Sequence, residues 1–337
     1  MTDEPKTIEA EPSPEPSPEP SPEPSPEPSG RGNLGAAVDA LAASWRLESP
    51  TRPEPPKPDG PPTLILAQTP EGLRAEVTPC TCTDGYQITD AGAVPCSACS
   101  TPKRAAALIN RCGLPAEPGA CYFAGYRYLN EPAPGEPDGE ERGGVVYVKG
   151  GAYLHPAQER RAALAAMRSL SDRVAKLRHV GELRGLSSVL LAGPPGVGKS
   201  YLGAAFALET ILAGARLAVR YCHMGGLLAE CRQSIQAQKR TQALVDAVAT
   251  VPVLVFDELG AGRATDWERS IADEIIARRY DAGLLTVSAT NYTTGADPEP
   301  EDLGALRNRI GPPAASRLWH RSVTYTLSGV DLRGVVS

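Results

Sequence analysis

Residues 193–200 read Gly-Pro-Pro-Gly-Val-Gly-Lys-Ser. This is a complete G-x-x-x-x-G-K-S pattern, the signature of a loop that cradles the phosphates of a nucleotide. A short apolar stretch at 189–192 precedes the loop, and a helix-forming stretch at 201–213 follows it. Strand, glycine-rich loop and helix are the order that such a site requires. The stretch therefore predicts a nucleotide-binding α/β domain; the alternative is a degenerate loop that no longer binds.

Each part of this loop has a chemical role. Glycines let the backbone curve closely around a phosphate, so that backbone N–H groups and the helix N-terminus face the anion. Lys199 would supply positive charge to the β- and γ-phosphates, and the Ser200 hydroxyl would bind Mg²⁺. The residues that we expect to bind the nucleotide and its metal are Gly193, Pro194, Pro195, Gly196, Val197, Gly198, Lys199, Ser200, Tyr201 and Asp257.

Two further apolar stretches end in polar residues. Residues 253–258 read Val-Leu-Val-Phe-Asp-Glu, which predicts a buried strand ending in two carboxylates. Asp257 would hold Mg²⁺ through water, and Glu258 would orient and deprotonate the attacking water. The alternative is a pair of surface acids. Thr290 and Asn291 end the next apolar stretch and should reach the same edge of the sheet, where ligands bind.

The pattern of the second half of the chain predicts the fold class. Apolar runs of strand length alternate with helical stretches, which is typical of a parallel sheet covered on both faces. We expect strands at 188–191, 217–221, 253–256, 284–288 and 323–327, and helices at 157–180, 199–213, 224–249, 266–282 and 302–309. The first of these helices should expose a basic face made of Arg160, Arg161, Arg168, Arg173, Lys176 and Arg178.

The preceding segment is rich in cysteine. Residues 80–99 contain a Cys-x-Cys pair and a Cys-x-x-Cys pair, and four thiolates so spaced suit tetrahedral Zn²⁺. We expect Cys80, Cys82, Cys96 and Cys99 to be the ligands; the alternative is free cysteines in a loop. Cys222 and Cys231 are expected to be ordinary thiols of the α/β body. The four histidines, His155, His179, His223 and His320, show no ligand-like clustering and are expected to be structural.

A helix at 105–112, a linker at 131–144 and a short strand at 145–148 are expected after the cysteine pairs. We therefore divide the chain into a tail at 1–62, a cysteine-rich zinc module with its linker at 63–150, and the nucleotide-binding domain at 151–337. No apolar run is long enough for a membrane span. No secretory signal begins the chain, so we expect a cytoplasmic protein.

The tail differs sharply in composition. The chain has 337 residues and a net charge of −6. Residues 1–30 carry eight acids and one lysine, or −7, which leaves +1 for the rest and excludes a strongly basic nucleic-acid binder. Residues 11–29 repeat Ser-Pro-Glu-Pro, which predicts an extended tether. Residues 33–48 predict a short amphipathic helix that either docks a partner or packs on the body.

These motifs together resemble an AAA+ ATPase, and within that class the DnaC/DnaI helicase-loader family with its IstB-like relatives. The resemblance covers about residues 76–333 and rests on the ordered elements GPPGVGKS at 193–200, VLVFDELG at 253–260 and TVSATN at 286–291. It implies that 193–200 is the Walker A loop and that Asp257 and Glu258 are the Walker B pair. Asn291 corresponds to sensor 1. The bound nucleotide would be ATP with Mg²⁺.

The resemblance also suggests roles for three late arginines. Arg309 and Arg317 match the region that supplies an arginine finger to a neighbouring subunit, with Arg317 favoured, and this implies a ring or filament. Arg333 matches a sensor-2-like arginine. The alternative for each is a surface ion pair. In the zinc module the first pair is Cys-x-Cys where the family has Cys-x-x-Cys. Cys112 or Cys121 is therefore a possible substitute for Cys80 or Cys82.

Residues 224–240 occupy the position of the family's single-stranded DNA contacts, which suggests Arg232, Lys239 and Arg240 as phosphate ligands; the alternative is a solvated helix face. The favoured function is ATP-driven loading of a hexameric, DnaB-like replicative helicase onto single-stranded DNA. One alternative is an IstB-like transposition helper. The other is a nucleotide-switched adaptor with vestigial hydrolysis, against which Glu258 argues.

Overall fold

A computed structural model describes residues 62–80, 82, 86–89, 92–115, 122–126, 140–142, 145–148, 151–154, 156–237, 241–295, 302 and 304–335. The expected acidic tail and the expected helix at 33–48 lie outside these residues. Within the described part of the chain, no helix combines the length and apolar character that crossing a membrane requires.

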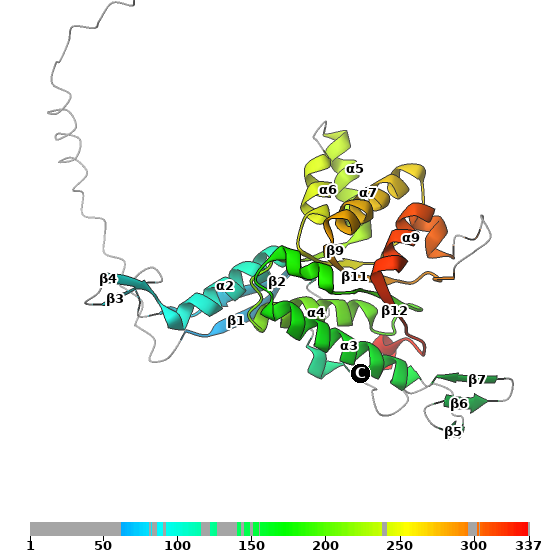
Figure 1. Cartoon of the computed structure of the whole chain (residues 1–337), viewed down its shortest axis with the longest axis horizontal. Helices are drawn as coiled ribbons and strands as arrows, with labels where there is room; N and C mark the ends of the chain where they lie inside the picture. The colour runs from blue at the N-terminus through cyan, green and yellow to red at the C-terminus, as the bar shows by residue number, and fades with distance from the viewer. Residues whose placement is uncertain are drawn as a thin grey trace, which may run out of the picture. The chain divides into compact units, whose positions relative to one another are not determined.

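The nucleotide-binding half is built on a parallel sheet of five strands, as predicted (Figure 1). Its order is β12-β8-β11-β10-β9, and every neighbouring pair is parallel. The glycine-rich loop directly follows β8, which lies between β12 and β11, and this parallel α/β arrangement agrees with the predicted P-loop NTPase fold. The strands are β8 Ser188–Ala192, β9 Val219–His223, β10 Val253–Asp257, β11 Leu285–Thr290 and β12 Ser322–Thr326.

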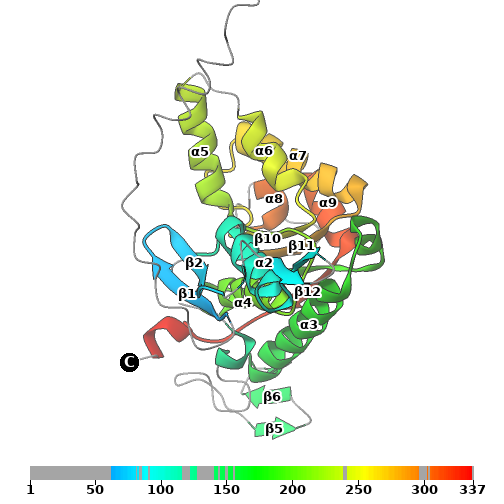
Figure 2. The same ribbon diagram turned by 90° about the vertical axis from the view of Figure 1, so that its left-hand side faces the viewer.

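Helices cover both faces of this sheet. On one side lie α3 Pro156–Lys176 and α4 Lys199–Leu212 (Figures 1 and 2). On the other side lie α5 Met224–Gln236, α6 Gln242–Ala249, α7 Asp266–Ala282, α8 Leu306–Ile310 and α9 Pro312–Arg321. All five strands end at one edge, which places their carboxyl ends together.

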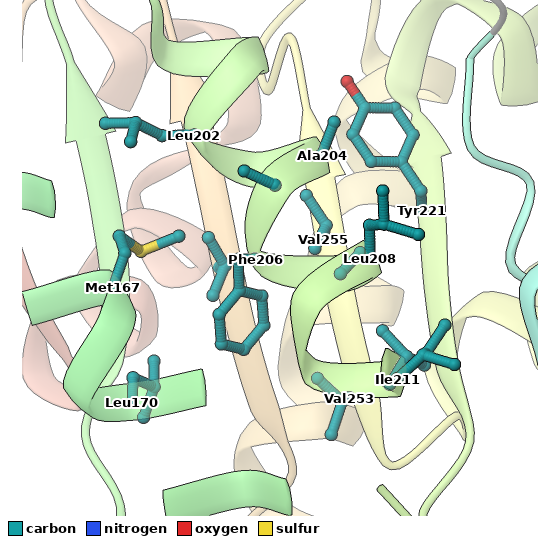
Figure 3. Packing of buried hydrophobic residues seen from close by; sticks show 14 of the residues in the cluster. Met167, Leu170, Leu202, Ala204, Phe206, Leu208, Ile211, Tyr221, Val253 and Val255 are labelled. Atoms are coloured by element: carbon teal, nitrogen blue, oxygen red, sulfur yellow. The ribbon is translucent and has the colours of Figure 1, made fainter. Parts of the chain in front are cut away.

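The side chains of β10 show how the sheet packs against the helices on each of its two faces. Val253 and Val255 join the apolar cluster under α3 and α4, whereas Leu254 and Phe256 join the cluster under α5 to α9. All four are at most 1% exposed, because the strand is covered on both faces. Figure 3 shows Val253 and Val255 close to α4, whose Phe206 is completely buried. Burying such an aromatic side chain contributes about 1.5–3 kcal/mol.

The cysteine-rich segment is a small α/β unit. Two hairpins, β1 Leu64–Thr69 with β2 Gly72–Val77 and β3 Tyr86–Thr89 with β4 Gly92–Pro95, precede α2 Ser97–Cys112. The Asn110 side chain joins α2 to β2, because it accepts a hydrogen bond from Ala75 N and donates one to Ala75 O. Gly113 ends α2 in the left-handed region, as its sequence position predicts. A three-stranded sheet follows, made of β5 Glu140–Arg142, β6 Val145–Val148 and β7 Gly151–Leu154.

Several local predictions were wrong. The expected helix at 224–249 is two helices, α5 and α6, and the expected helix at 302–309 is the shorter α8. The helix expected at 105–112 begins at Ser97, and the expected linker contains β5. The helix α9 and the β1–β2 hairpin were not predicted. The helix α9 begins at Pro312 and Pro313, and proline is well tolerated at a helix start.

One member of the expected basic face of α3 is not on that face. Arg160 is fully buried, while Arg161, Arg168, Arg173 and Lys176 have the expected exposure. Residues 157, 160, 164 and 167 follow helical spacing and share the buried stripe.

Candidate nucleotide-binding site

The glycine-rich loop joins β8 to α4 at the carboxyl edge of the sheet. Gly198, directly before α4, has φ +93°, a left-handed conformation that other residues rarely adopt. Gly193 has φ +148°, and a Cβ there would lie 2.0 Å from Leu327 O of the segment after β12. A side chain at either glycine would deform the loop, so the pattern that predicted a close phosphate cradle also fits its backbone.

Lys199 begins α4 and bends back over this loop. Its ammonium donates hydrogen bonds to Gly193 O at 2.9 Å and to Pro194 O at 2.6 Å, and the residue is only 5% exposed. Burial, with a smaller contribution from the positive charge of Arg333, lowers the pKa of Lys199 to about 8, although the Asp257 and Glu258 carboxylates oppose the shift. A phosphate bound at this point would place negative charge beside the ammonium and stabilise its protonated form.

Asp257 is the centre of a hydrogen-bond cluster at the end of β10. Ser200 Oγ donates to Asp257 Oδ1 at 3.0 Å, the backbone N–H of Glu258 donates to the same oxygen at 2.9 Å, and the Tyr221 hydroxyl donates to Oδ2. Hydroxyl and carboxylate oxygens are the kind of ligand that Mg²⁺ takes, directly or through bound water. The oxygens of Ser200 and Asp257 therefore suit Mg²⁺ in kind. Tyr221 was not predicted from the sequence.

Glu258 continues directly from this cluster. Its backbone has φ +50°, an uncommon conformation for a residue with a side chain. Its carboxylate lies 3.0 Å from His223 Nε2, and both side chains are nearly half exposed. His223 was expected to be structural, and it does cap α5, because its Nδ1 accepts a hydrogen bond from Gly226 N. The contact of its other ring nitrogen with Glu258 was not predicted. His223 is the residue of β9 that pairs in register with Asp257, which brings its imidazole to the carboxylates.

The end of β11 is hydrogen-bonded to the loop that follows Glu258. Leu259 N donates to Ala289 O at 2.7 Å, and Thr290 Oγ1 donates to Leu259 O at 2.8 Å. Asn291 follows as an exposed residue. The structure thus brings the ends of β8, β10 and β11 together at one edge, as expected.

A tyrosine from outside the α/β body completes the base of the loop. Tyr126 is 6% exposed, and its hydroxyl donates to Val197 O at 3.1 Å. A Cβ at Gly198 would lie 2.6 Å from the Tyr126 ring, which therefore packs directly on the loop. No motif identifies Tyr126, because its position depends on how the segment before α3 folds against α4.

With this geometry in place, the chain can be compared with known proteins. Residues 163–295 match the family described as IstB-like ATP binding protein. This stretch is therefore similar to IstB-like ATP-binding proteins. This match includes the glycine-rich loop, Asp257, Glu258 and Asn291.

Curated relatives of the ATP-binding domain have two different names. The putative ATP-binding protein of insertion sequence IS21 from Pseudomonas aeruginosa is 27% identical over 161 residues, which is 46% of this chain and 57% of that protein. The replicative helicase loader DnaI of Bacillus subtilis is 29% identical over 131 residues, 39% of this chain and 40% of that protein. The helicase loader DnaC of Escherichia coli is 26% identical over 116 residues, 34% and 46%. The chain thus spans about half the length of these relatives.

Solved structures give the same two loader names. The crystal structure of the DnaC helicase loader matches with a TM-score of 0.41 and 24% identity over 50% of this chain and 90% of that one. The structure of DnaI matches with a TM-score of 0.41 and 22% identity over 50% and 85%.

The three late arginines of the ATP-binding domain have different surroundings. Arg309 is buried and donates to the Gly260 and Gly262 carbonyls of its own chain, and its expected role as a finger candidate stays a prediction. Arg317 is partly exposed on α9 and pairs with Asp273 at 2.9 Å. Arg333 is exposed and follows Leu332, whose N–H donates to Gly196 O at 3.1 Å.

The four predicted zinc ligands converge. The sulfur atoms of Cys80, Cys82, Cys96 and Cys99 all lie within 4.8 Å of one another. Cys80 and Cys96 are 3.7 Å apart, and Cys82 and Cys99 are 3.4 Å apart. Four sulfurs at about 2.3 Å from a tetrahedral Zn²⁺ lie about 3.8 Å from one another, so the cluster fits the ion.

Cys80 and Cys82 therefore both belong to the cluster, despite their Cys-x-Cys spacing. Cys112, one proposed substitute, is buried at the opposite end of α2 from Cys96, and Cys121 lies outside the described residues. Cys96 occupies the N-cap position of α2, and a hydrogen bond from the Cys99 backbone lowers the pKa of its thiol to about 7. A lowered pKa favours the thiolate that a metal requires.

Of the three residues expected to contact DNA, the structure describes Arg232. Arg232 on α5 forms an ion pair with the buried Glu268, and its guanidinium lies 5.4 Å from the centre of the Trp267 ring. Its side chain is 47% exposed, so it presents an open face as well. Lys239 and Arg240 lie outside the described residues.

Proposed function

We propose that the protein hydrolyses ATP with Mg²⁺ and uses this cycle to load a hexameric replicative helicase onto single-stranded DNA. The observation that carries the enzymatic part is the cluster of Lys199, Ser200, Asp257 and Glu258 at one edge of the sheet. A phosphate loop alone would support binding. A carboxylate beside the metal ligands is what hydrolysis adds.

Each residue has a distinct task in this proposal. The loop N–H groups and Lys199 bind the phosphates, and Asn291 orients the attacking water. Glu258 accepts the proton of that water as it attacks the γ-phosphate. Mg²⁺, held by Ser200 and Asp257, would neutralise charge on the phosphate oxygens. Arg317 of a neighbouring subunit would add a guanidinium to the same phosphate, which requires a ring or filament.

The four-cysteine cluster favours a helicase as the client. It lies in a unit with its own hairpins and helix, in which the Asn110 side chain joins α2 to β2. In the resemblance to helicase loaders, such a module precedes the ATPase and grips the helicase. Lys239 and Arg240, with the open face of Arg232, are the proposed phosphate contacts on single-stranded DNA.

An IstB-like transposition helper is the second candidate. The family match at 163–295 and the Pseudomonas aeruginosa relative favour it. The chemistry at the nucleotide would be the same, and the client would be a transposase. The cysteine module argues for the helicase, because the resemblance to transposition helpers does not include this module.

Binding to purified clients tests the proposal. Glu258→Gln with ATP and Mg²⁺ should hold the bound state, because the phosphate ligands remain and the base is removed. We expect near-stoichiometric capture of the organism's replicative helicase and none of its transposases. Capture of a transposase instead would replace the first candidate by the second. Capture of neither, with normal ATP binding, would overturn both.

A further inference from the structure

Arg309 occupies an unusual position for an arginine that matches a subunit-bridging region. It lies on α8 and is 8% exposed. Its Nε donates to Gly260 O at 2.5 Å, and its Nη2 donates to Gly262 O. Its guanidinium carbon lies 4.2 Å from the centre of the Tyr292 ring, close enough for a cation–π contact.

These three contacts join the two loops that carry the proposed chemistry. Gly260 and Gly262 belong to the loop that follows Glu258, and Tyr292 directly follows Asn291. One guanidinium therefore ties the loop of the proposed base to the loop of the proposed water-orienting amide. A lysine has no planar fork and could not reach both carbonyls and stack on the ring.

The loop after Glu258 needs such a restraint. Gly260 and Gly262 have φ +91° and +115°, and glycine gives the unfolded loop many alternative conformations. A Cβ at Gly260 would lie 2.9 Å from Tyr292 and 3.0 Å from Leu306, so the backbone is packed closely at this point. Other anchors of the loop are the hydrogen bonds that join Leu259 to Ala289 and Thr290, the N–H of Gly260 on Met224 Sδ, and the N–H groups of Arg263 and Thr265 on the Glu268 carboxylate. None of these anchors holds the Gly260 or Gly262 carbonyl.

We infer that Arg309 is a positioning residue that fixes Glu258 and Asn291 within its own subunit. This rests on the proposed function, because the atoms it positions are those of ATP hydrolysis. Moving the guanidinium to a neighbour's phosphate would take this donor away from the carbonyls of the buried Gly260 and the exposed Gly262, and would break the contact with the Tyr292 ring. The contact with the phosphate of a neighbouring subunit is therefore assigned to Arg317, whose partner Asp273 is partly exposed.

Amide hydrogen exchange tests the structural half of this inference without nucleotide and at a concentration where the chain is monomeric. Arg309→Lys should raise exchange at residues 259–263, while Arg307→Ala on the same helix should leave it unchanged. Equal exchange in wild type and Arg309→Lys would overturn the inference. Peptides from β8 and α4 report whether the variant is folded.

Kinetics with mixed subunits tests the catalytic half. Arg309→Lys should lower kcat by about 10²-fold, because a displacement of about 1 Å has this effect, while KM for ATP stays near wild type. Adding an excess of Glu258→Gln subunits, which keep Arg309, should not restore turnover. In the parallel mixture with Arg317→Ala, the same subunits should restore it. Restoration of the Arg309→Lys variant would show action in trans and overturn the inference. Absence of turnover in wild type would instead refute the proposed function.

Discussion

Lys199 shows how one side chain can hold a positive charge where the surroundings disfavour it. The ammonium is buried and close to Arg333, and the oxygens that offset these effects are two loop carbonyls and the Asp257 and Glu258 carboxylates. Its pKa of about 8 is therefore far below the value of about 10.4 for a solvated lysine. This makes nucleotide binding sensitive to pH.

We expect the affinity for ATP to fall as the pH rises above about 8. Below that pH Lys199 is charged in both the free and the bound protein, so binding moves no proton. Above it the free lysine is neutral, and binding must take up a proton because phosphate raises the pKa. Calorimetry in buffers of different ionisation enthalpy measures this uptake. An affinity and proton count that stay constant from pH 7 to 9.5 would contradict the assignment.

His223 and Glu258 give a second prediction for single residues. Because the imidazole holds the carboxylate at 3.0 Å, His223→Ala should leave the base without a fixed orientation. We expect turnover to fall about tenfold, or ~1.4 kcal/mol in the barrier, with ATP affinity unchanged. His320→Ala is the matched control, since His320 contacts Tyr280 on α7. Unchanged or faster turnover in His223→Ala would be inconsistent with this role.

At the scale of elements, α2 depends on the sulfur cluster at its first turn. Cys96 occupies the N-cap position of the helix and Cys99 lies within it, while Cys80 and Cys82 come from the preceding loop. A metal in this cluster would join the loop to the helix, and its binding energy would add to folding.

We expect Cys82→Ser to lose bound zinc and to raise amide exchange at residues 97–101. Replacing a thiolate by a hydroxyl removes one of four soft ligands and opens the tetrahedral site. Elemental analysis measures the metal content of the purified chain. Cys112→Ala is the control, because it removes a buried thiol outside the cluster and should retain the metal. Equal zinc content in wild type and Cys82→Ser would refute the four-cysteine site.

Tyr126 joins another element to the phosphate loop. Tyr126→Phe removes the hydroxyl that binds Val197 O and keeps the ring that packs on Gly198. A neutral hydrogen bond of this kind contributes about 0.5–1.5 kcal/mol, so we expect ATP to bind roughly 2- to 10-fold more weakly. Calorimetric titration measures the change, and Tyr122→Phe provides an exposed tyrosine for comparison. An unchanged dissociation constant would mean that the hydroxyl does not support the loop.

At the scale of the whole molecule, the parts that the sequence predicted are those encoded by contiguous patterns. The strands before Gly193 and Asp257 are short apolar runs, and their motifs follow at once, so neither needs knowledge of distant contacts. The contacts of His223, Tyr221 and Arg309 were not predicted, because they join segments that are distant in sequence. Strand register would have revealed His223, which pairs with Asp257. Arg160 could have been found from helical periodicity alone.

Tertiary contacts also decide how the segments before α3 relate to the ATP-binding domain. Leu73, Ile109 and Tyr126 belong to the same apolar cluster as the α4 side of the sheet. The segments before α3 and the α4 side of the sheet therefore share one packed core. No pattern within the short cysteine segment predicts this, because each side of the interface is only a few apolar residues.

Steady-state release of phosphate from ATP by the purified chain tests the central claim most directly. Wild type with Mg²⁺ should turn over, and Glu258→Gln should bind ATP with similar affinity but release phosphate at least about 10²-fold more slowly, as expected for loss of a general base. Equal rates in the two proteins, or no Mg²⁺-dependent turnover by wild type in the presence of single-stranded DNA and helicase, would contradict it.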